Sequence, residues 1–185
     1  MNQDARVTVT LFHASKRDGL AQLDPAASHS QNLFGPAIYA TKDRGTAECQ
    51  HGPIKSIYQI KATGPFKAII ELNQAFGFQD EFAQKAIEAV CRRYRLTTLP
   101  VRVEPVLFWI DGATRELIDR GVTFPAATLI NRALADEGIW LLRGVADPIT
   151  ATLPQDRGIQ WAILKADHAS IMAEEPRYLP LPEMA

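Results

Sequence analysis

The chain has 185 residues, of which 46% are hydrophobic and 22% are charged, which suits one globular domain of ordinary size. Twenty lysines and arginines balance twenty-one aspartates and glutamates, so the formal net charge is -1 at pH 7. This composition excludes an intrinsically disordered chain, which needs low hydrophobicity together with high net charge. It also favours neither nucleic acid nor an anionic membrane as the partner.

The composition also bears on where the protein works. The polar first six residues lead into no apolar signal-peptide core, and the apolar stretches are far shorter than the roughly 20 residues of a membrane span. We therefore expect one cytoplasmic domain over residues 1–185, with an extended, proline-containing tail over about 174–185. Cys49 and Cys91 are too few for a disulfide framework, and reduced thiols are the simpler expectation.

The first 72 residues are predicted to form mainly strands. Val7–His13 alternates apolar and polar residues, many of them β-branched, as half-buried strands do. Further strands are predicted at 37–40, 56–61 and 66–72, with a turn at 64–65 and a helix from about 43 to 51. The polar stretch 14–36 is long for a connection, which is typical of functional loops.

The rest of the chain is predicted to contain three helices before it returns to strands. Apolar residues at spacings of three and four indicate helices at Gln79–Arg93 and Pro125–Glu137, and a shorter one is predicted at Asp111–Arg120. Buried strands are predicted at Ile139–Leu142 and Ile159–Leu164, followed by a short terminal element. Because strands and helices do not alternate regularly, α+β is the expected fold class.

Common catalytic and binding motifs are absent from the sequence. It contains no P-loop, no glycine-rich dinucleotide fingerprint after a strand, and no Gly-x-Ser-x-Gly elbow. Neither Cys-x-x-Cys nor His-Glu-x-x-His occurs, so we expect no metal.

Three separated segments nevertheless combine into a recognisable pattern. Residues 11–15 read Leu-Phe-His-Ala-Ser, residues 34–41 read Phe-Gly-Pro-Ala-Ile-Tyr-Ala-Thr, and residues 158–164 read Gly-Ile-Gln-Trp-Ala-Ile-Leu. Together they resemble the His-Tyr-Glu branch of the ADP-ribosyltransferase superfamily, which includes diphtheria-toxin-like and PARP-like proteins. The stretch from about 73 to 123 carries no part of this resemblance.

The resemblance implies both a fold and an activity. The fold would consist of two small packed β-sheets flanked by helices, with NAD in a central cleft. The reaction would transfer ADP-ribose from NAD to a macromolecule, with release of nicotinamide. The acceptor itself stays open among a protein side chain, a nucleic acid and a small molecule, and the net charge of -1 favours a protein over a nucleic acid. A bacterial or phage effector or toxin is the role that such a glycosyl transfer suggests, including an effector that is injected or otherwise secreted.

The resemblance also implies roles for particular residues. His13 would hold the adenosine ribose, the backbone of Ala14 would pair with the nicotinamide amide, and Ser15 would reach a ribose or phosphate oxygen. Tyr39 would stack on the nicotinamide ring. Gly35 belongs to the tyrosine motif, and we expect it to line the cofactor site. Arg44 follows it and could meet the pyrophosphate.

The third motif position departs from the family pattern, because Gln160 stands where the family has glutamate. An amide can bond the ribose 2′-hydroxyl, but it offers neither a negative charge nor a base. Asp156 is the nearest replacement, and Glu137 and Asp147 are weaker ones. The glutamine therefore supports an alternative in which the protein is catalytically inactive and binds NAD, an ADP-ribosylated ligand or a partner protein.

A third interpretation treats the resemblance as accidental. Taken alone, His13 would more often be a structural histidine, Tyr39 a core aromatic and Gln160 a solvated or capping side chain. This interpretation predicts that His13 and Tyr39 do not face a common cleft.

Overall fold

The computed structural model describes residues 5–27, 35–48, 54–122, 126–145 and 159–176. Within these residues, the strands form one sheet in the order β4-β5-β6-β2-β1-β3-β7. The strands are β1 (Arg6–Ser15), β2 (Ile38–Thr41), β3 (Ser56–Pro65), β4 (Ile69–Glu71), β5 (Leu141–Val145), β6 (Ile159–Ile163) and β7 (Ala169–Pro176). The predicted α+β class is confirmed. The prediction of two small sheets is wrong, because all the described strands belong to one sheet.

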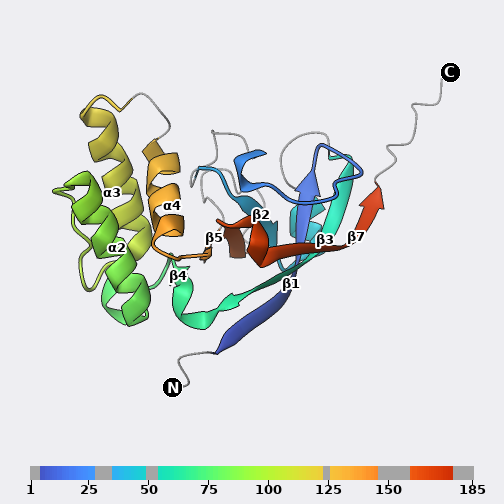
Figure 1. The fold of residues 1–185 in the computed structure, drawn as a ribbon, viewed down its shortest axis with the longest axis horizontal. Helices are drawn as coiled ribbons and strands as arrows, with labels where there is room; N and C mark the ends of the chain where they lie inside the picture. The colour runs from blue at the N-terminus through green and yellow to red at the C-terminus, as the bar shows by residue number, and fades with distance from the viewer. Residues whose placement is uncertain (1–4, 28–34, 49–53, 123–125, 146–158, 177–185) are drawn as a thin grey trace.

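Three long helices form a layer at one end of this sheet. They are α2 (Glu81–Tyr94), α3 (Val106–Asp119) and α4 (Ala126–Asp136), whereas the short helix α1 (Arg44–Glu48) follows β2. Figure 1 shows α2, α3 and α4 grouped beside β4 and β5, while β1, β3 and β7 extend away from them. None of the described helices is long and apolar enough to cross a membrane.

Two local predictions are wrong for identifiable reasons. Strand β3 continues through Gly64 and Pro65, where a turn was predicted, and Gly64 pairs with Val7 on β1. The glycine is needed for packing, because a Cβ atom there would lie 2.3 Å from the ring of Trp140. Helix α3 starts five residues earlier than predicted, directly after Pro105, whose fixed φ suits a residue at a helix start.

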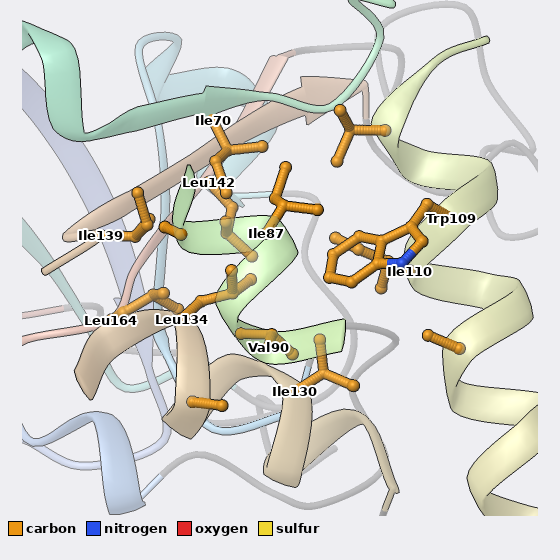
Figure 2. Close-up of a cluster of buried hydrophobic side chains, with 14 of the residues drawn as sticks. Ile70, Ile87, Val90, Trp109, Ile110, Ile130, Leu134, Ile139, Leu142 and Leu164 are labelled. Carbon is orange, nitrogen blue, oxygen red and sulfur yellow. The ribbon is translucent and has the colours of Figure 1, made fainter. Parts of the chain in front are cut away.

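Side chains that alternate along each strand divide the core into two clusters. On one face of the sheet, Tyr39, Ile70, Leu142 and Ala162 pack with apolar residues of α2, α3 and α4; we call this the helix-side cluster. Figure 2 shows Ile70 and Leu142 surrounded by side chains from these helices. The helix layer is therefore fixed to the β4-β5-β6-β2 part of the sheet.

The opposite face of the sheet carries the second cluster. It contains the alternate residues of the same strands, with members from β1 and β3 as well: Leu11, Ile38, Ala40, Tyr58, Ile60, Leu141, Trp161 and Ile163. All three tryptophans are buried, and Trp161 lies on the face opposite to Gln160.

The sheet is weakly joined at one position. Strands β1 and β3 pair at ten positions, and β2 and β6 pair at four, but β1 and β2 pair only at Phe12 and Thr41. We call the junction between β1 and β2 the seam. It divides the sheet into β4-β5-β6-β2 on one side and β1-β3-β7 on the other.

Candidate functional site

The three segments that carry the family resemblance lie on adjacent strands. His13 is on β1, Tyr39 on β2 and Gln160 on β6, and these strands are neighbours in the sheet. Thr41 of β2 pairs with Phe12 on one side and with Gln160 on the other. Residues more than one hundred positions apart in the chain therefore meet around the seam.

The backbone of Ala14 points into the seam. The Ser15 carbonyl accepts a hydrogen bond from Lys55 N–H at 2.9 Å, and the Ala5 carbonyl accepts one from Phe66 N–H at 2.8 Å. The odd-numbered residues of β1 thus direct their backbone groups toward β3, and the even-numbered ones direct theirs toward β2. Within the described residues, the ladder provides Ala14 with no partner on β2, because pairing stops at Phe12.

The imidazole of His13 bonds the backbone carbonyl of β2 that would otherwise pair with Ala14. Its Nδ1 lies 2.7 Å from the carbonyl oxygen of Tyr39, the group that a continued ladder would have offered to Ala14. Since a carbonyl can only accept, Nδ1 carries the proton, and Nε2 of the neutral ring is an acceptor. Burial lowers the pKa of His13, although the bond to the Tyr39 carbonyl opposes this. His13 is therefore neutral at pH 7.

The side chains of His13 and Tyr39 lie on opposite faces of the sheet. Tyr39 belongs to the helix-side cluster, is 8% exposed, and donates its hydroxyl to the Gly35 carbonyl at 2.5 Å. His13 alternates with Phe12, so it shares a face with Leu11 and Tyr58. Tyr39 and His13 thus meet through the Tyr39 carbonyl and not through their rings, and side chains on opposite faces of the sheet do not face a common cleft. This is the arrangement that the third interpretation, an accidental resemblance, predicts.

Gly35 has a packing role in this structure. Its φ is +69°, and a Cβ atom there would lie 2.9 Å from the backbone of Thr128 and 3.1 Å from that of Ala127 on α4. Only glycine permits both the left-handed conformation and this close approach. The segment before β2 is thereby held against the helix layer.

Ser15 and Arg44 both have partners within the protein. The Ser15 hydroxyl oxygen accepts the N–H of Arg17 at 3.0 Å. Arg44 pairs with Glu175 at 2.6 Å and with Glu48 at 3.3 Å, and all three side chains are partly exposed. A ligand that used Arg44 would compete with these two carboxylates.

Only one of the three carboxylates considered as replacements for the family glutamate lies within the described residues. Asp156 and Asp147 lie outside the described residues. Glu137 is exposed and follows α4 just before β5, whereas Gln160 pairs with Gly144 near the other end of β5. Glu137 is therefore not part of this site.

A row of side chains that the sequence analysis missed crosses the second face of the sheet through His13. Strand register aligns Glu71, Arg143, Trp161 and Ala40 on one side of the seam, and His13, Tyr58 and Glu174 on the other. The alternating pattern of residues 56–61 predicts the strand that contains Tyr58. A pattern within one segment does not show which residues of other strands lie beside it.

Each end of this row carries a glutamate. Arg143 lies 3.2 Å from Glu71 and 5.1 Å from the centre of the Trp161 ring. Burial raises the pKa of Glu71, and the nearby Arg143 opposes this. At the other end, Glu174 accepts a hydrogen bond from the Tyr58 hydroxyl at 2.8 Å. The two glutamates lie on the outer strands β4 and β7, and Ala40 separates Trp161 from His13 in the row.

Comparison with known proteins adds one distant structural neighbour. No protein-family model and no curated protein matches the chain. A crystal structure of an anti-CRISPR protein aligns with 89% of this chain and 96% of its own, at 13% identity and a TM-score of 0.42. A likeness at this level assigns neither a fold family nor an activity. In the part of the chain that the structure describes, no group of three or more potential metal ligands occurs.

Proposed function

We propose that this protein is an NAD-dependent mono-ADP-ribosyltransferase whose NAD site is the seam between β1 and β2. The observation that carries the proposal is the meeting of the His, Tyr and Gln segments on three adjacent strands, at the point where strand pairing stops. NAD is the substrate, and the acceptor would be a macromolecule, a protein in preference to a nucleic acid. A role as a bacterial or phage effector rests on the family resemblance alone.

The backbone of Ala14 supports this assignment. Its N–H and carbonyl point toward β2, but strand pairing ends at Phe12, so within the described residues the ladder gives Ala14 no partner on β2. A planar primary amide presents an N–H donor and its carbonyl acceptor side by side, so the nicotinamide amide could complete the ladder there. The resemblance implies the same contact for the residue after the histidine.

His13 supplies the second supporting feature. The Tyr39 carbonyl fixes its tautomer, so Nε2 accepts a hydrogen bond from a ribose hydroxyl without a change of protonation. Tyr39 contributes this carbonyl, and its ring belongs to the helix-side cluster. Stacking of Tyr39 on nicotinamide therefore has less support than the role of His13.

A second candidate function, NAD binding without transfer, is favoured by Gln160. It pairs with Thr41 of β2, and the resemblance implies that this is the position where the family carries its carboxylate. An amide can orient the ribose but cannot stabilise an oxocarbenium-like transition state by charge. Release of nicotinamide separates the two candidates.

The test is NAD titration by calorimetry on the wild-type protein, His13→Ala and His168→Ala, with nicotinamide release followed in the same samples. His168 is a matched control, because its Nδ1 also lies 2.7 Å from a backbone carbonyl, that of Thr63, far along β3 from the seam. We expect binding to be lost in His13→Ala and kept in His168→Ala. Equal affinity in both variants would refute the site.

Ala14→Pro tests the backbone contact directly. Proline removes the N–H that points into the seam, and no bond to β3 uses that group. We expect the variant to fold, as judged by circular dichroism, and to bind NAD about two- to tenfold more weakly, as loss of one neutral hydrogen bond predicts. Unchanged affinity in a folded Ala14→Pro variant would argue against the nicotinamide contact.

A further inference from the structure

Helix α3 presents a narrow stripe of four side chains to solvent. Phe108 and Ile118 are 60% and 55% exposed, and the side chains of Asp111 and Arg115 are 51% and 74% exposed. We call these four residues the α3 stripe. The residues of α3 that pack into the core lie on its opposite face: Val106, Trp109, Ile110, Ala113 and Leu117.

The α3 stripe has the geometry of a surface through which helices pair. Its members follow one another at spacings of three, four and three residues, so they lie above one another along one side of the helix. These are the spacings of the a and d positions in a coiled coil. Helix α3 therefore has a second contact surface besides the one that faces the core.

The order of the side chains makes the stripe complementary to a copy of itself that runs in the opposite direction. Phe108 and Ile118 are equally far from Ala113 in the sequence, and so are Asp111 and Arg115. In two antiparallel α3 helices related by a two-fold axis at the level of Ala113, Asp111 of each copy meets Arg115 of the other. By the same symmetry, Phe108 meets Ile118 at both ends.

Charge complementarity selects this direction. Parallel pairing of two stripes would bring Asp111 to Asp111 and Arg115 to Arg115, whereas antiparallel pairing brings opposite charges together. Charged residues at such positions determine register, and the apolar residues at the two ends contribute burial.

The two charged groups can bond a second copy without leaving each other. Arg115 lies 2.8 Å from Asp111 within the same helix, and both side chains are at least half exposed. An exposed pair of this kind contributes little by itself. A carboxylate accepts at two oxygens and a guanidinium donates from five N–H groups, so each retains bonding capacity. Antiparallel pairing would join two separate ion pairs into one network of four alternating charges.

The segment before α3 adds apolar surface beside the stripe. Thr98 N–H bonds Glu116 at 2.7 Å, and a Cβ atom on Gly112 would lie 2.8 Å from the methyl group of Thr98. The chain is therefore held along α3 at this point, and Leu99, the next residue, is 62% exposed.

We propose that α3 forms a homodimer interface in which the α3 stripe pairs antiparallel with the α3 stripe of a second copy of this chain. The inference is independent of NAD binding, because the stripe and the seam share no residue. Figure 1 shows α3 in the helix layer, at the end of the molecule opposite to β7. The contact extends over about three turns of one helix, so the interface is small and the dimer is a weak one.

Sedimentation equilibrium of the full chain tests the assembly, over about 1 μM to 1 mM protein, the range in which weak complexes dissociate. We expect the mass to rise with concentration from the 20.5 kDa of one chain toward twice that value. Phe108→Ser should raise the Kd of the dimer at least tenfold, because it removes an aromatic anchor. Met172→Ser is the matched control on β7, where Met172 is 56% exposed, and should keep the Kd within twofold.

Charge reversal tests the antiparallel register. Asp111→Arg and Arg115→Asp should each raise the Kd at least tenfold, since like charges then meet at both symmetric positions. The double variant with both reversals should dimerise as the wild type does, because acid and base have only exchanged places. A mixture of the two single variants should form a heterodimer, in which the acidic stripe of one copy meets the basic stripe of the other.

A second ion pair of the same spacing controls for the lost contact within the helix. Glu81 and Lys85 form an exposed pair on α2 at 2.6 Å. Lys85→Glu removes that pair without changing the α3 stripe, so the Kd of the dimer should stay within twofold. Thermal unfolding of every variant shows that it remains folded.

Each possible result decides the proposal. A chain that stays monomeric up to about 1 mM would overturn it and leave the stripe to a different kind of partner. A dimer that neither Phe108→Ser nor Asp111→Arg weakens would have its interface elsewhere. A dimer that the single reversals weaken, but that neither the double variant nor mixing restores, would exclude the antiparallel register. None of these results bears on the proposed NAD site.

Discussion

Replacement of Gly35 by alanine separates a packing role from a ligand-binding role for this residue. The added Cβ would meet the backbone of Thr128 at 2.9 Å, and backbone atoms of a helix cannot rotate away as a side chain can. The left-handed conformation, with φ of +69°, costs a non-glycine residue about 1–2 kcal/mol. Overpacking adds about 1–3 kcal/mol.

These two effects predict that Gly35→Ala lowers the free energy of unfolding by about 2–5 kcal/mol, a large part of the roughly 5–15 kcal/mol of a typical domain. For a chain of this length, each kcal/mol lowers Tm by about 2–4 °C. Gly121→Ala is the control, because Gly121 has φ of +81° with nothing within 4 Å of the added Cβ. It should lose only about 1–2 kcal/mol.

Urea unfolding followed by circular dichroism measures both values, with the slope m checked for constancy. Equal losses in Gly35→Ala and Gly121→Ala would refute the close approach of the β2 segment to α4. A small loss of stability combined with a large loss of NAD affinity would instead restore Gly35 as a ligand-binding residue.

Three further predictions concern ionisable or amide groups. Because burial lowers the pKa of His13 below 6.5, the unfolded chain binds a proton at His13 more readily than the folded chain does. The free energy of unfolding should therefore fall as the pH drops below about 6.5. Urea unfolding at pH 5–8 should show a smaller dependence on pH in His13→Gln. Gln160→Glu introduces the carboxylate that the ADP-ribosyltransferase pattern has at this position; under the proposed function it should raise nicotinamide release about 10²–10³-fold, whereas an unchanged rate would remove residue 160 from the proposed reaction. Bonds from Thr97 and Thr98 lower the pKa of Glu116 to about 2, so its contribution is complete above about 4.5 and is lost as pH falls toward 2; Glu116→Gln should lack this slope in acid unfolding.

Local patterns in the sequence were sufficient for most elements. The spacing of apolar residues placed α2 and α4 within two residues of their observed ends, and Asp80 caps α2 by accepting Phe82 N–H at 2.9 Å. Such signals depend on residues three or four positions apart and are visible in one segment. The turn predicted at Gly64 is wrong because the ring of Trp140, which lies 76 residues away in the sequence, leaves no room for a Cβ atom there.

The candidate site could be predicted only in part, because contacts between distant segments are not visible within any one of them. The motifs identified His13, Tyr39 and Gln160, but which face each side chain takes follows from strand register. A family pattern of residue types contains no register, so the placement of His13 and Tyr39 on opposite faces required the sheet. Glu174 carries no motif, and its donors come from β3 and from the loop after β1.

The parallel pairing of β4 with β5 has a consequence for how the chain reaches this structure. β4 ends at Glu71 and β5 begins at Leu141, so the whole layer of α2, α3 and α4 is synthesised between them. Until β6 arrives, β2 has only its single pair with β1, and Ile38 and Ala40 lack the neighbours that bury them. Pairings this distant in sequence form slowly. The β2 side of the seam therefore gains its second neighbouring strand only when β6 has been made, and a chain that ends before β6 would have the helix layer without the segment that carries Gln160.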